Sequence, residues 1–363
     1  MNVCVVGAGP AGSYAAYLLA RQGHAVSVFE DHKEIGMPIQ CTGIVTKALF
    51  DLVPYDDKYI VNKARSVLVH SSNASIEVPL DEYIICRHRF DKFVAEMATR
   101  SGVKYHLGHK FVSHTNNKAV FRHNGKETVH SFDILVGADG PLSKVAKSSR
   151  LYETQDCWIG CQATMKSKWV SDKFETWFGS DVAPGFFGWS VPESNVLSRV
   201  GVAGTNKARL FFEKLQKRVN GVIVSMTGGP IPIYKKRIVQ NKNVFLVGDA
   251  GGFVKATTGG GIITGMLSSK ALAESIQNNK PYEYYLRSLR RELWIHERIR
   301  KILNRFSDKD YDYLLWLMNK EKIKKILREH PREFPSRFIL KLLLAEPRLL
   351  WFAKHMFLFY VLF

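Results

Sequence analysis

The first thirty residues constrain the fold of this chain more than any other stretch. We expect a short buried strand over 2–6, the turn Gly-Ala-Gly-Pro-Ala-Gly over 7–12, and an Ala- and Leu-rich helix over 13–22. A second apolar strand, 25–29, closes on Glu30. A G-x-G-x-x-G turn between a strand and a helix, followed by an acidic residue, is typical of a dinucleotide-binding unit. An ordinary glycine turn is the alternative, and the surrounding strand-helix-strand pattern disfavours it.

Each of these motif residues has a physical role. Gly7 makes the tight turn, and Gly9 allows the backbone to approach a pyrophosphate. Gly12 permits close packing of the helix against the strand, while the helix N-terminus faces the phosphates. Glu30 can accept hydrogen bonds from a ribose.

Two later strands end in similar small, acid-bearing turns. A buried strand reaches Gly-Ala-Asp-Gly at 137–140, and another reaches Gly-Asp-Ala at 248–250. Three glycines at 259–261 then precede a helix expected over 263–277. Asp249 can bind a ribityl hydroxyl, and the helix start offers N–H groups to an electron-rich ring edge. One extended cofactor touched at three separated points fits FAD better than NAD.

The length of 363 residues and the order of elements predict two lobes and a tail. The fold class is α/β, with a Rossmann-type FAD-binding lobe, a mainly antiparallel β substrate lobe and a helical C-terminal region. The FAD-binding lobe spans 1–150, with a β insertion around 60–85, and returns over 241–280. The substrate lobe spans 151–240, and the helical region covers 281–363.

Residues between the first two turns carry further strand and helix patterns. Strands are expected over 66–70 and 75–78, and a helix over 90–100. Four segments, 103–107, 111–114, 119–123 and 128–132, resemble a run of antiparallel strands, with Asn-Gly at 124–125 as a hairpin turn.

The five cysteines are few, odd in number and widely spread, which excludes a disulfide framework. No C-x-x-C pair is present, so we expect no metal site. The chain enters a strand at once, leaving no room for a signal peptide. These features predict a cytoplasmic protein.

Three anionic partners could explain the formal charge of +19: nucleic acid, an anionic membrane surface or an anionic substrate. Residues 281–363 hold 18 lysines and arginines against 10 acidic residues. Nucleic acid is the weakest candidate, because no nucleic-acid-binding motif is present. The apolar end, 338–363, is interrupted by charges and cannot span a membrane as one helix, which needs ~20 apolar residues. It can lie in a membrane interface, at the inner face of the cell membrane, or pack on the protein.

Together these motifs resemble the p-hydroxybenzoate-hydroxylase-type flavoprotein fold, and within it the geranylgeranyl reductase family. The specific markers are Pro-Ile-Gln-Cys-Thr-Gly at 38–43 and Phe-x-Trp-x-Val-Pro at 187–192. The family motif is aromatic-x-Trp-x-Phe-Pro, so Val191 is a departure. The resemblance covers about residues 1–280.

The resemblance implies an FAD enzyme that saturates isoprenoid double bonds, in archaea those of digeranylgeranylglycerol phospholipids. Hydride transfer from reduced flavin would be completed by a proton. The implied substrate is a prenyl lipid, and the electron donor would be NAD(P)H or reduced ferredoxin.

The resemblance also implies site residues. Cys41 is the catalytic candidate, with a small packed residue as the alternative. Phe187, Trp189 and Pro192 are implied to bind substrate, although aromatic residues here can instead form core. Arg87 is implied to contact the FAD phosphate and ribose, or is a solvated charge. The implied cofactor-binding set is Gly7, Gly9, Ala11, Gly12, Glu30, Gln40, Cys41, Thr42, Gly43, Arg87, Val112, Asp249, Gly260, Gly261 and Ile262.

Two other classes share features of this chain. Flavin monooxygenases and halogenases have the same fold, and halogenases carry Trp-x-Trp-x-Ile-Pro near the same region. Phe187 replaces the first of those tryptophans, which counts against the halogenase interpretation. A flavoprotein that only binds lipid or a partner is the non-catalytic alternative.

Overall fold

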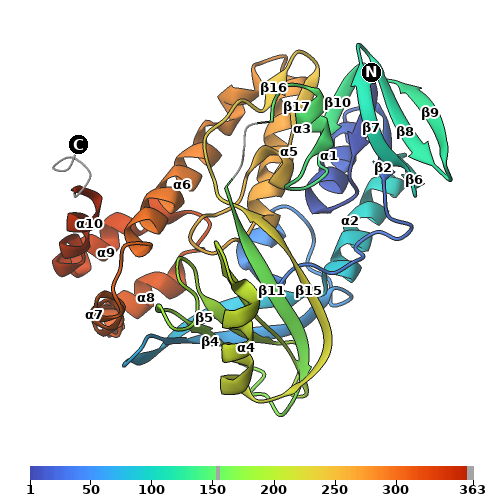
Figure 1. Ribbon diagram of the computed structural model, residues 1–363. Coiled ribbons are helices and arrows are strands. Elements are labelled where there is room, and N and C mark those ends of the chain that lie inside the picture. The colour runs from blue at the N-terminus through green and yellow to red at the C-terminus, as the bar shows by residue number, and fades with distance from the viewer. Residues whose placement is uncertain (153–155, 358–363) are drawn as a thin grey trace.

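The computed structural model describes residues 1–152 and 156–357, which form two large sheets, a small sheet and a helical C-terminal region (Figure 1). The last six residues of the apolar end predicted over 338–363 lie outside the described residues.

The first large sheet carries the nucleotide-binding motif. Its strand order is β16-β17-β10-β1-β2-β6, and every pair is parallel except β16 with β17. β1 and β10 are almost entirely buried because helices cover the sheet. The strands are β1 (Asn2–Val6), β2 (Ala25–Glu30), β6 (Lys104–Leu107), β10 (Ile134–Gly137), β16 (Gln240–Asn241) and β17 (Val244–Leu246). The helices associated with it are α1 (Pro10–Arg21), α2 (Arg87–Arg100), α3 (Lys144–Ser148) and α5 (Ile262–Gln277), with a 3-10 turn η2 (Gly248–Gly251).

Two expectations for this lobe are corrected. α1 begins at Pro10 rather than at residue 13. N–H groups in the first turn of a helix have no partner within the helix, so a proline, which has no N–H, can be its first residue. Gly12 therefore lies inside the helix. The segment predicted over 103–107 is β6, which pairs parallel with β2 instead of joining the antiparallel run. It follows α2, and a crossover through a helix returns the chain parallel to its neighbour.

The second large sheet has the order β15-β11-β14-β13-β12-β4-β5-β3. The strands around 60–85 belong to this sheet: β12 pairs parallel with β4, and the other pairs are antiparallel. The helix α4 (Ala208–Val219) also packs on this sheet and lies in a region predicted to be mainly β. The strands are β3 (Ile44–Thr46), β4 (Ile60–His70), β5 (Ser75–Ile85), β11 (Cys157–Lys166), β12 (Lys173–Trp177), β13 (Gly188–Pro192), β14 (Leu197–Gly204) and β15 (Val222–Pro232), and a 3-10 turn η1 (Lys47–Asp51) follows β3.

The small sheet, β7-β8-β9, is antiparallel as expected. Its strands are β7 (Lys110–Thr115), β8 (Lys118–His123) and β9 (Lys126–Ser131). Asn124 and Gly125 have φ of 48° and 79°, as the tight hairpin turn requires. The register shifts between Phe111 and Ser113, so Val112 lies in a β-bulge.

The C-terminal region is helical and gathers at one end of the molecule, with α6 leading to it from the first sheet (Figure 1). Its elements are α6 (Tyr282–Leu303), α7 (Asp308–Met318), α8 (Glu321–Glu329), η3 (Pro335–Arg337), α9 (Ile339–Ala345), η4 (Pro347–Ala353) and α10 (Lys354–Phe357). α7 and α8 contact β5 of the second sheet. In the described part of the chain, every helix is too short or too polar to cross a bilayer.

Candidate functional site

The nucleotide turn shows three glycines in three different situations. Gly7 has φ of 104°, and a Cβ atom there would lie 2.4 Å from the carbonyl oxygen of Ala138. A Cβ on Gly12 would lie 2.0 Å from the carbonyl oxygen of Gly7. Gly9 instead faces open space, with no described atom within 4 Å of the position of a Cβ. Gly7 and Gly12 are thus required by packing, and Gly9 leaves its side of the turn open to a ligand.

The amides at the start of α1 are available to an anion. Gly9 is the N-cap of α1, and none of the described side chains hydrogen-bonds to the free N–H groups as a cap. Uncapped N–H groups and the positive end of the helix dipole favour a phosphate at this position.

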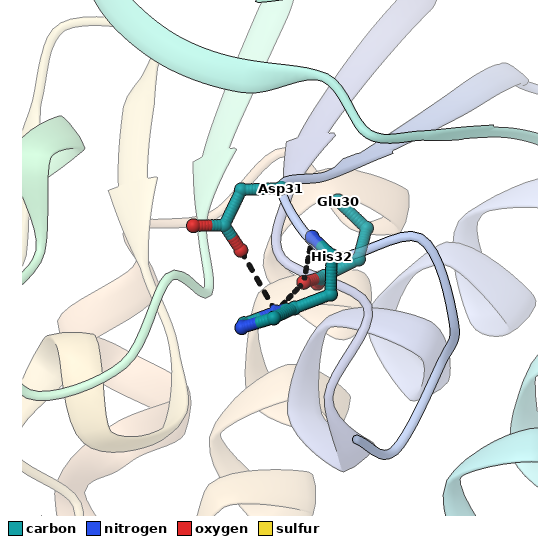
Figure 2. A group of neighbouring side chains, drawn as sticks. All are labelled: Glu30, Asp31 and His32. Carbon is teal, nitrogen blue, oxygen red and sulfur yellow. Dashed lines mark hydrogen bonds and ion pairs between the residues drawn. The ribbon is translucent and has the colours of Figure 1, made fainter. Parts of the chain in front are cut away.

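Glu30 ends β2 beside the same turn, and its side chain lies next to those of Asp31 and His32 (Figure 2). Its Oε2 accepts a hydrogen bond from the Ala8 amide at 2.8 Å, and its Oε1 lies 2.6 Å from Nδ1 of His32. Asp31 also approaches that nitrogen, at 2.9 Å. The ligand atoms of Glu30, Asp31 and His32 lie within 4.8 Å of one another. Because a carboxylate has about four acceptor positions, Glu30 retains capacity for ribose hydroxyls.

Arg87 begins α2 and is not a free surface charge. Its Nε and Nη2 donate to the two carboxylate oxygens of Asp91 at 2.9 and 2.8 Å. The guanidinium also lies beside the Cys41 thiol and near Asp249. A cation fixed by one carboxylate at the cavity wall still has N–H groups with which to bind a ligand oxygen.

Cys41 lies in the loop between β2 and β3, where Gly43 donates its N–H to the thiol sulfur at 3.3 Å. Gln162 of β11 holds this loop: its Nε2 donates to the Cys41 carbonyl at 3.4 Å, and its Oε1 accepts from the Thr42 hydroxyl at 3.0 Å. The same Oε1 accepts from the indole N–H of Trp189 at 3.0 Å. Gln162 therefore joins the predicted catalytic loop to the predicted substrate wall.

Asp249 and the glycine-rich loop at 259–261 lie on the other side of the site from Cys41. The Asp249 carboxylate lines the cavity without a hydrogen-bond donor among the described residues, and burial raises its pKa. A Cβ on Gly261 would lie 2.7 Å from Oδ1 of Asp249, so a larger residue there would displace the carboxylate. Gly261 is the N-cap of α5, again with no described side chain acting as the cap. An unpaired acceptor and unpaired donors face the same space.

These groups open into one cavity of about 790 Å³. Its cofactor end is lined by Gly9, Ala11, Arg87, Asp249 and the 259–262 loop. The rest is mainly apolar and lies between the second sheet and the C-terminal helices. Representative apolar lining residues are Val67, Val78, Phe174, Leu314, Leu315 and Leu327.

The structure gathers most of the predicted site residues at this cavity. Those that line it are Gly9, Ala11, Gln40, Cys41, Thr42, Gly43, Arg87, Phe187, Trp189, Asp249, Gly260, Gly261 and Ile262. Gly7, Gly12, Glu30 and Val112 lie outside it: the first three form and flank the turn, and Val112 is in the β7 bulge. Within the described residues, Pro192 is not part of the lining; it is buried at the end of β13, and its carbonyl accepts from Asn62 at 2.8 Å.

Three residues that contribute to the cavity were missed from the sequence. Gln162 is a lone amide in a mainly apolar strand, and that isolation was the only signal in the sequence. Lys255 lies in the glycine-rich loop, and Glu333 lies 78 positions later, so their ion pair had no sequence signal.

The residues fit an FAD. The turn leaves space at Gly9 for a pyrophosphate, Asp249 offers an unpaired acceptor for a hydroxyl, and the uncapped start of α5 offers donors. A dinucleotide with a polar chain and a ring with hydrogen-bonding edges matches that set of groups.

Comparisons with known proteins agree with this geometry. Residues 5–54 match the model of an NAD(P)-binding Rossmann-like domain. The digeranylgeranylglycerophospholipid reductase of Methanothrix thermoacetophila is 27% identical, with 98% of this chain and 99% of that protein covered. The protein of the same name from Methanocaldococcus jannaschii is also 27% identical, covering 91% and 95%.

Solved structures share the fold. A geranylgeranyl bacteriochlorophyll reductase-like protein from Thermoplasma acidophilum has a TM-score of 0.82 at 21% identity, covering 97% of this chain and 98% of that one. A flavin-dependent halogenase has a TM-score of 0.70 at 16% identity, covering 97% and 77%. The resemblance to geranylgeranyl reductases and the α/β flavoprotein fold predicted from the motifs are confirmed.

Proposed function

We propose that this chain is an FAD-dependent reductase that saturates C=C bonds in the geranylgeranyl chains of archaeal-type membrane lipids. The observation that carries the proposal is a cavity of about 790 Å³ that joins a nucleotide-binding end to a mainly apolar chamber. Its nearly full-length relatives are named for that reaction. An apolar chamber beside a flavin site suits a hydrocarbon chain.

The cofactor would lie along the first sheet. Gly7, Gly9, Ala11 and Gly12 would hold the pyrophosphate at the start of α1, and Glu30 would bind the adenosine ribose. Val112 would contact the adenosine end through bulge backbone groups that do not pair regularly with β8. Asp249 would bind the ribityl chain. When bound and reduced, FAD supplies a hydride to the alkene.

The loop at 40–43 would form one side of the reaction centre. Gln40, Thr42 and Gly43 line the cavity beside Cys41. Because an isolated alkene is not polarised, a proton must reach one carbon as the hydride reaches the other. Cys41 would hold that proton at its sulfur or position the reacting groups, with Arg87 beside it.

The lipid chain would lie against the aromatic wall. Phe187 and Trp189 contact each other with ring centroids 5.9 Å apart, and both line the cavity. Pro192 would act only by supporting β13 behind that wall. These apolar surfaces would exclude water from the reaction centre.

The outer surface of the C-terminal helices would contact the membrane. Trp316, Leu344 and Trp351 are each more than half exposed. Arg348 stacks on Trp316 at 4.8 Å and Lys354 on Trp351 at 4.1 Å. Exposed tryptophans beside cations suit an anionic lipid surface. The protein would thus be cytoplasmic with peripheral contact at the inner face of the cell membrane, receiving electrons from NAD(P)H or reduced ferredoxin.

The test is anaerobic photoreduction of the FAD-loaded protein with unsaturated archaeal phospholipid, followed by mass spectrometry of the lipid. The proposal expects two added hydrogen atoms for every double bond lost. Flavin-dependent halogenases and monooxygenases share the fold, so an aerobic arm with halide tests the alternative. An added oxygen or halogen, or flavin that reduces no prenyl lipid, would overturn the reductase proposal.

A further inference from the structure

A buried ion pair connects the glycine-rich loop to the C-terminal region. The Nζ of Lys255 lies 2.5 Å from Oε1 of Glu333, and both side chains are nearly inaccessible, at 6% and 2% exposure. The Thr46 hydroxyl donates to the other oxygen of Glu333 at 2.5 Å. Both members of the pair line the cavity.

Lys255 lies directly against the loop that would contact the flavin. Its backbone closes that loop: the Lys255 N–H donates to the Gly260 carbonyl at 3.1 Å, and the Gly259 N–H donates to the Lys255 carbonyl at 2.8 Å. A Cβ on Gly260 would lie 3.0 Å from Cε and 3.3 Å from Nζ of Lys255. The ammonium group is therefore packed behind Gly260, one residue before the N-cap of α5.

Glu333 approaches the same place from the opposite side. It belongs to the segment between α8 and η3. The residue before it, Arg332, forms an ion pair with Glu82 of β5 at 2.7 Å. Burial raises the pKa of the Glu333 carboxyl, but Lys255 and Arg332 lower it to about 2. The carboxylate is thus charged, and it reduces the positive field that Lys255 would otherwise exert on the cavity.

We propose that the Lys255–Glu333 pair sets the reduction potential of the FAD held by this chain. This inference rests on the proposed function, because it requires a flavin whose ring edge lies at Gly260–Ile262. A reduced flavin carries more negative charge than an oxidised one, so a nearby ammonium group favours reduction. Lys255 is the member next to the loop, and Glu333 attenuates its effect. Lys255 and Glu333 act here on the potential of the cofactor and do not donate to substrate.

The experiment measures the potential of bound FAD against reference dyes in the full-length protein. Burial lowers the pKa of Lys255, and the Glu333 carboxylate counteracts that effect. The potential of Glu333→Gln is therefore measured over a falling pH series, and it is expected to rise above wild type where Lys255 is protonated. The double variant Lys255→Met with Glu333→Gln is expected to fall below wild type, and it leaves no lone buried charge that would prevent folding. For Glu333→Gln with Lys255 protonated, the expected change in the ratio of reduced to oxidised flavin is on the order of tenfold, the effect of one unit charge at roughly 10 Å and an effective dielectric of about 20. The double variant removes both charges, so its change should be smaller.

Two controls separate the outcomes. Glu346 is a buried carboxylate in the same region, paired with Lys320 and Arg348, and is not among the described residues lining the cavity. Glu346→Gln should therefore leave the potential unchanged. Lys255→Arg keeps the charge and should remain close to wild type. Wild-type protein that binds no FAD contradicts the proposed function. If all variants bind FAD at the wild-type potential, the function stands and this inference is wrong.

Discussion

The glycine turn allows a test in which neighbouring positions separate folding from cofactor binding. In Gly12→Ala, the new Cβ would lie 2.0 Å from the carbonyl oxygen of Gly7 and 3.0 Å from the Cβ of Ala138. Non-bonded atoms normally stay roughly 3.5 Å apart, and a backbone oxygen cannot rotate away. Overpacking typically costs about 1–3 kcal/mol, and this contact with rigid backbone should reach the upper end.

Gly9→Ala is the matched control. Gly9 has φ of −68° and ψ of 179°, which any residue adopts, and its side is open. Its unfolding free energy should change by less than about 0.5 kcal/mol, since alanine also reduces the freedom of the unfolded chain. A methyl group there would overlap a bound phosphate and cost about 1–3 kcal/mol of binding free energy. That cost raises the Kd for FAD roughly 5- to 150-fold.

The assays are urea unfolding of the FAD-free variants and fluorescence titration of FAD. We expect Gly12→Ala to lower the unfolding free energy by about 3 kcal/mol and the melting temperature by on the order of 5 °C. Gly9→Ala should keep its stability and lose affinity. A Gly12→Ala variant as stable as wild type, or a Gly9→Ala variant equally destabilised, would refute this division of roles.

Three further predictions concern the cavity. Cys41→Ala should bind FAD normally but reduce alkene at least about tenfold more slowly in anaerobic single turnovers; a wild-type rate would remove the thiol from catalysis. Gln162→Leu leaves the Trp189 indole N–H without its acceptor. Urea unfolding followed by tryptophan fluorescence should show that the free energy of unfolding falls by about 1–3 kcal/mol. Unchanged stability would contradict the bridging role of Gln162. Glu333 has a lowered pKa of about 2, so its stabilisation is present above about pH 4.5 and lost as the pH falls towards 2. That loss of unfolding free energy, on the order of 3 kcal/mol, should be absent in Glu333→Gln when unfolding is measured against pH. If both proteins lose the same stability as the pH falls, the prediction is wrong.

Local patterns predicted the parts of the site that are local in the chain. The turn at 7–12, the strand that leads to Asp249 and the Asn124–Gly125 hairpin follow from a few adjacent residues whose conformations are restricted. The helix start at Gly261 was predicted for the same reason. α1 was placed three residues late because Pro10 was treated as part of the turn instead of the first helical residue.

Contacts between distant segments could not be read in this way. Gln162 reaches Thr42 across 120 positions, and Lys255 reaches Glu333 across 78. Such partners depend on how the two sheets and the C-terminal region pack, and a single glutamine or lysine carries no periodicity that indicates it. The prediction for Pro192 came from a motif, and motif membership does not fix whether a side chain faces the cavity or supports the strand behind it.

The two large sheets interrupt each other along the chain, and this has a consequence for folding. β10 pairs with β17 only after residues 157–232 have contributed five strands to the second sheet, and β12 of that sheet pairs with β4, whose residues precede β10. The first sheet therefore cannot be complete until residue 246 has been synthesised. Closing such long loops is entropically unfavourable and slow. We expect a nascent chain to remain incompletely paired through most of translation, and neither sheet to persist as an independent fragment after proteolysis.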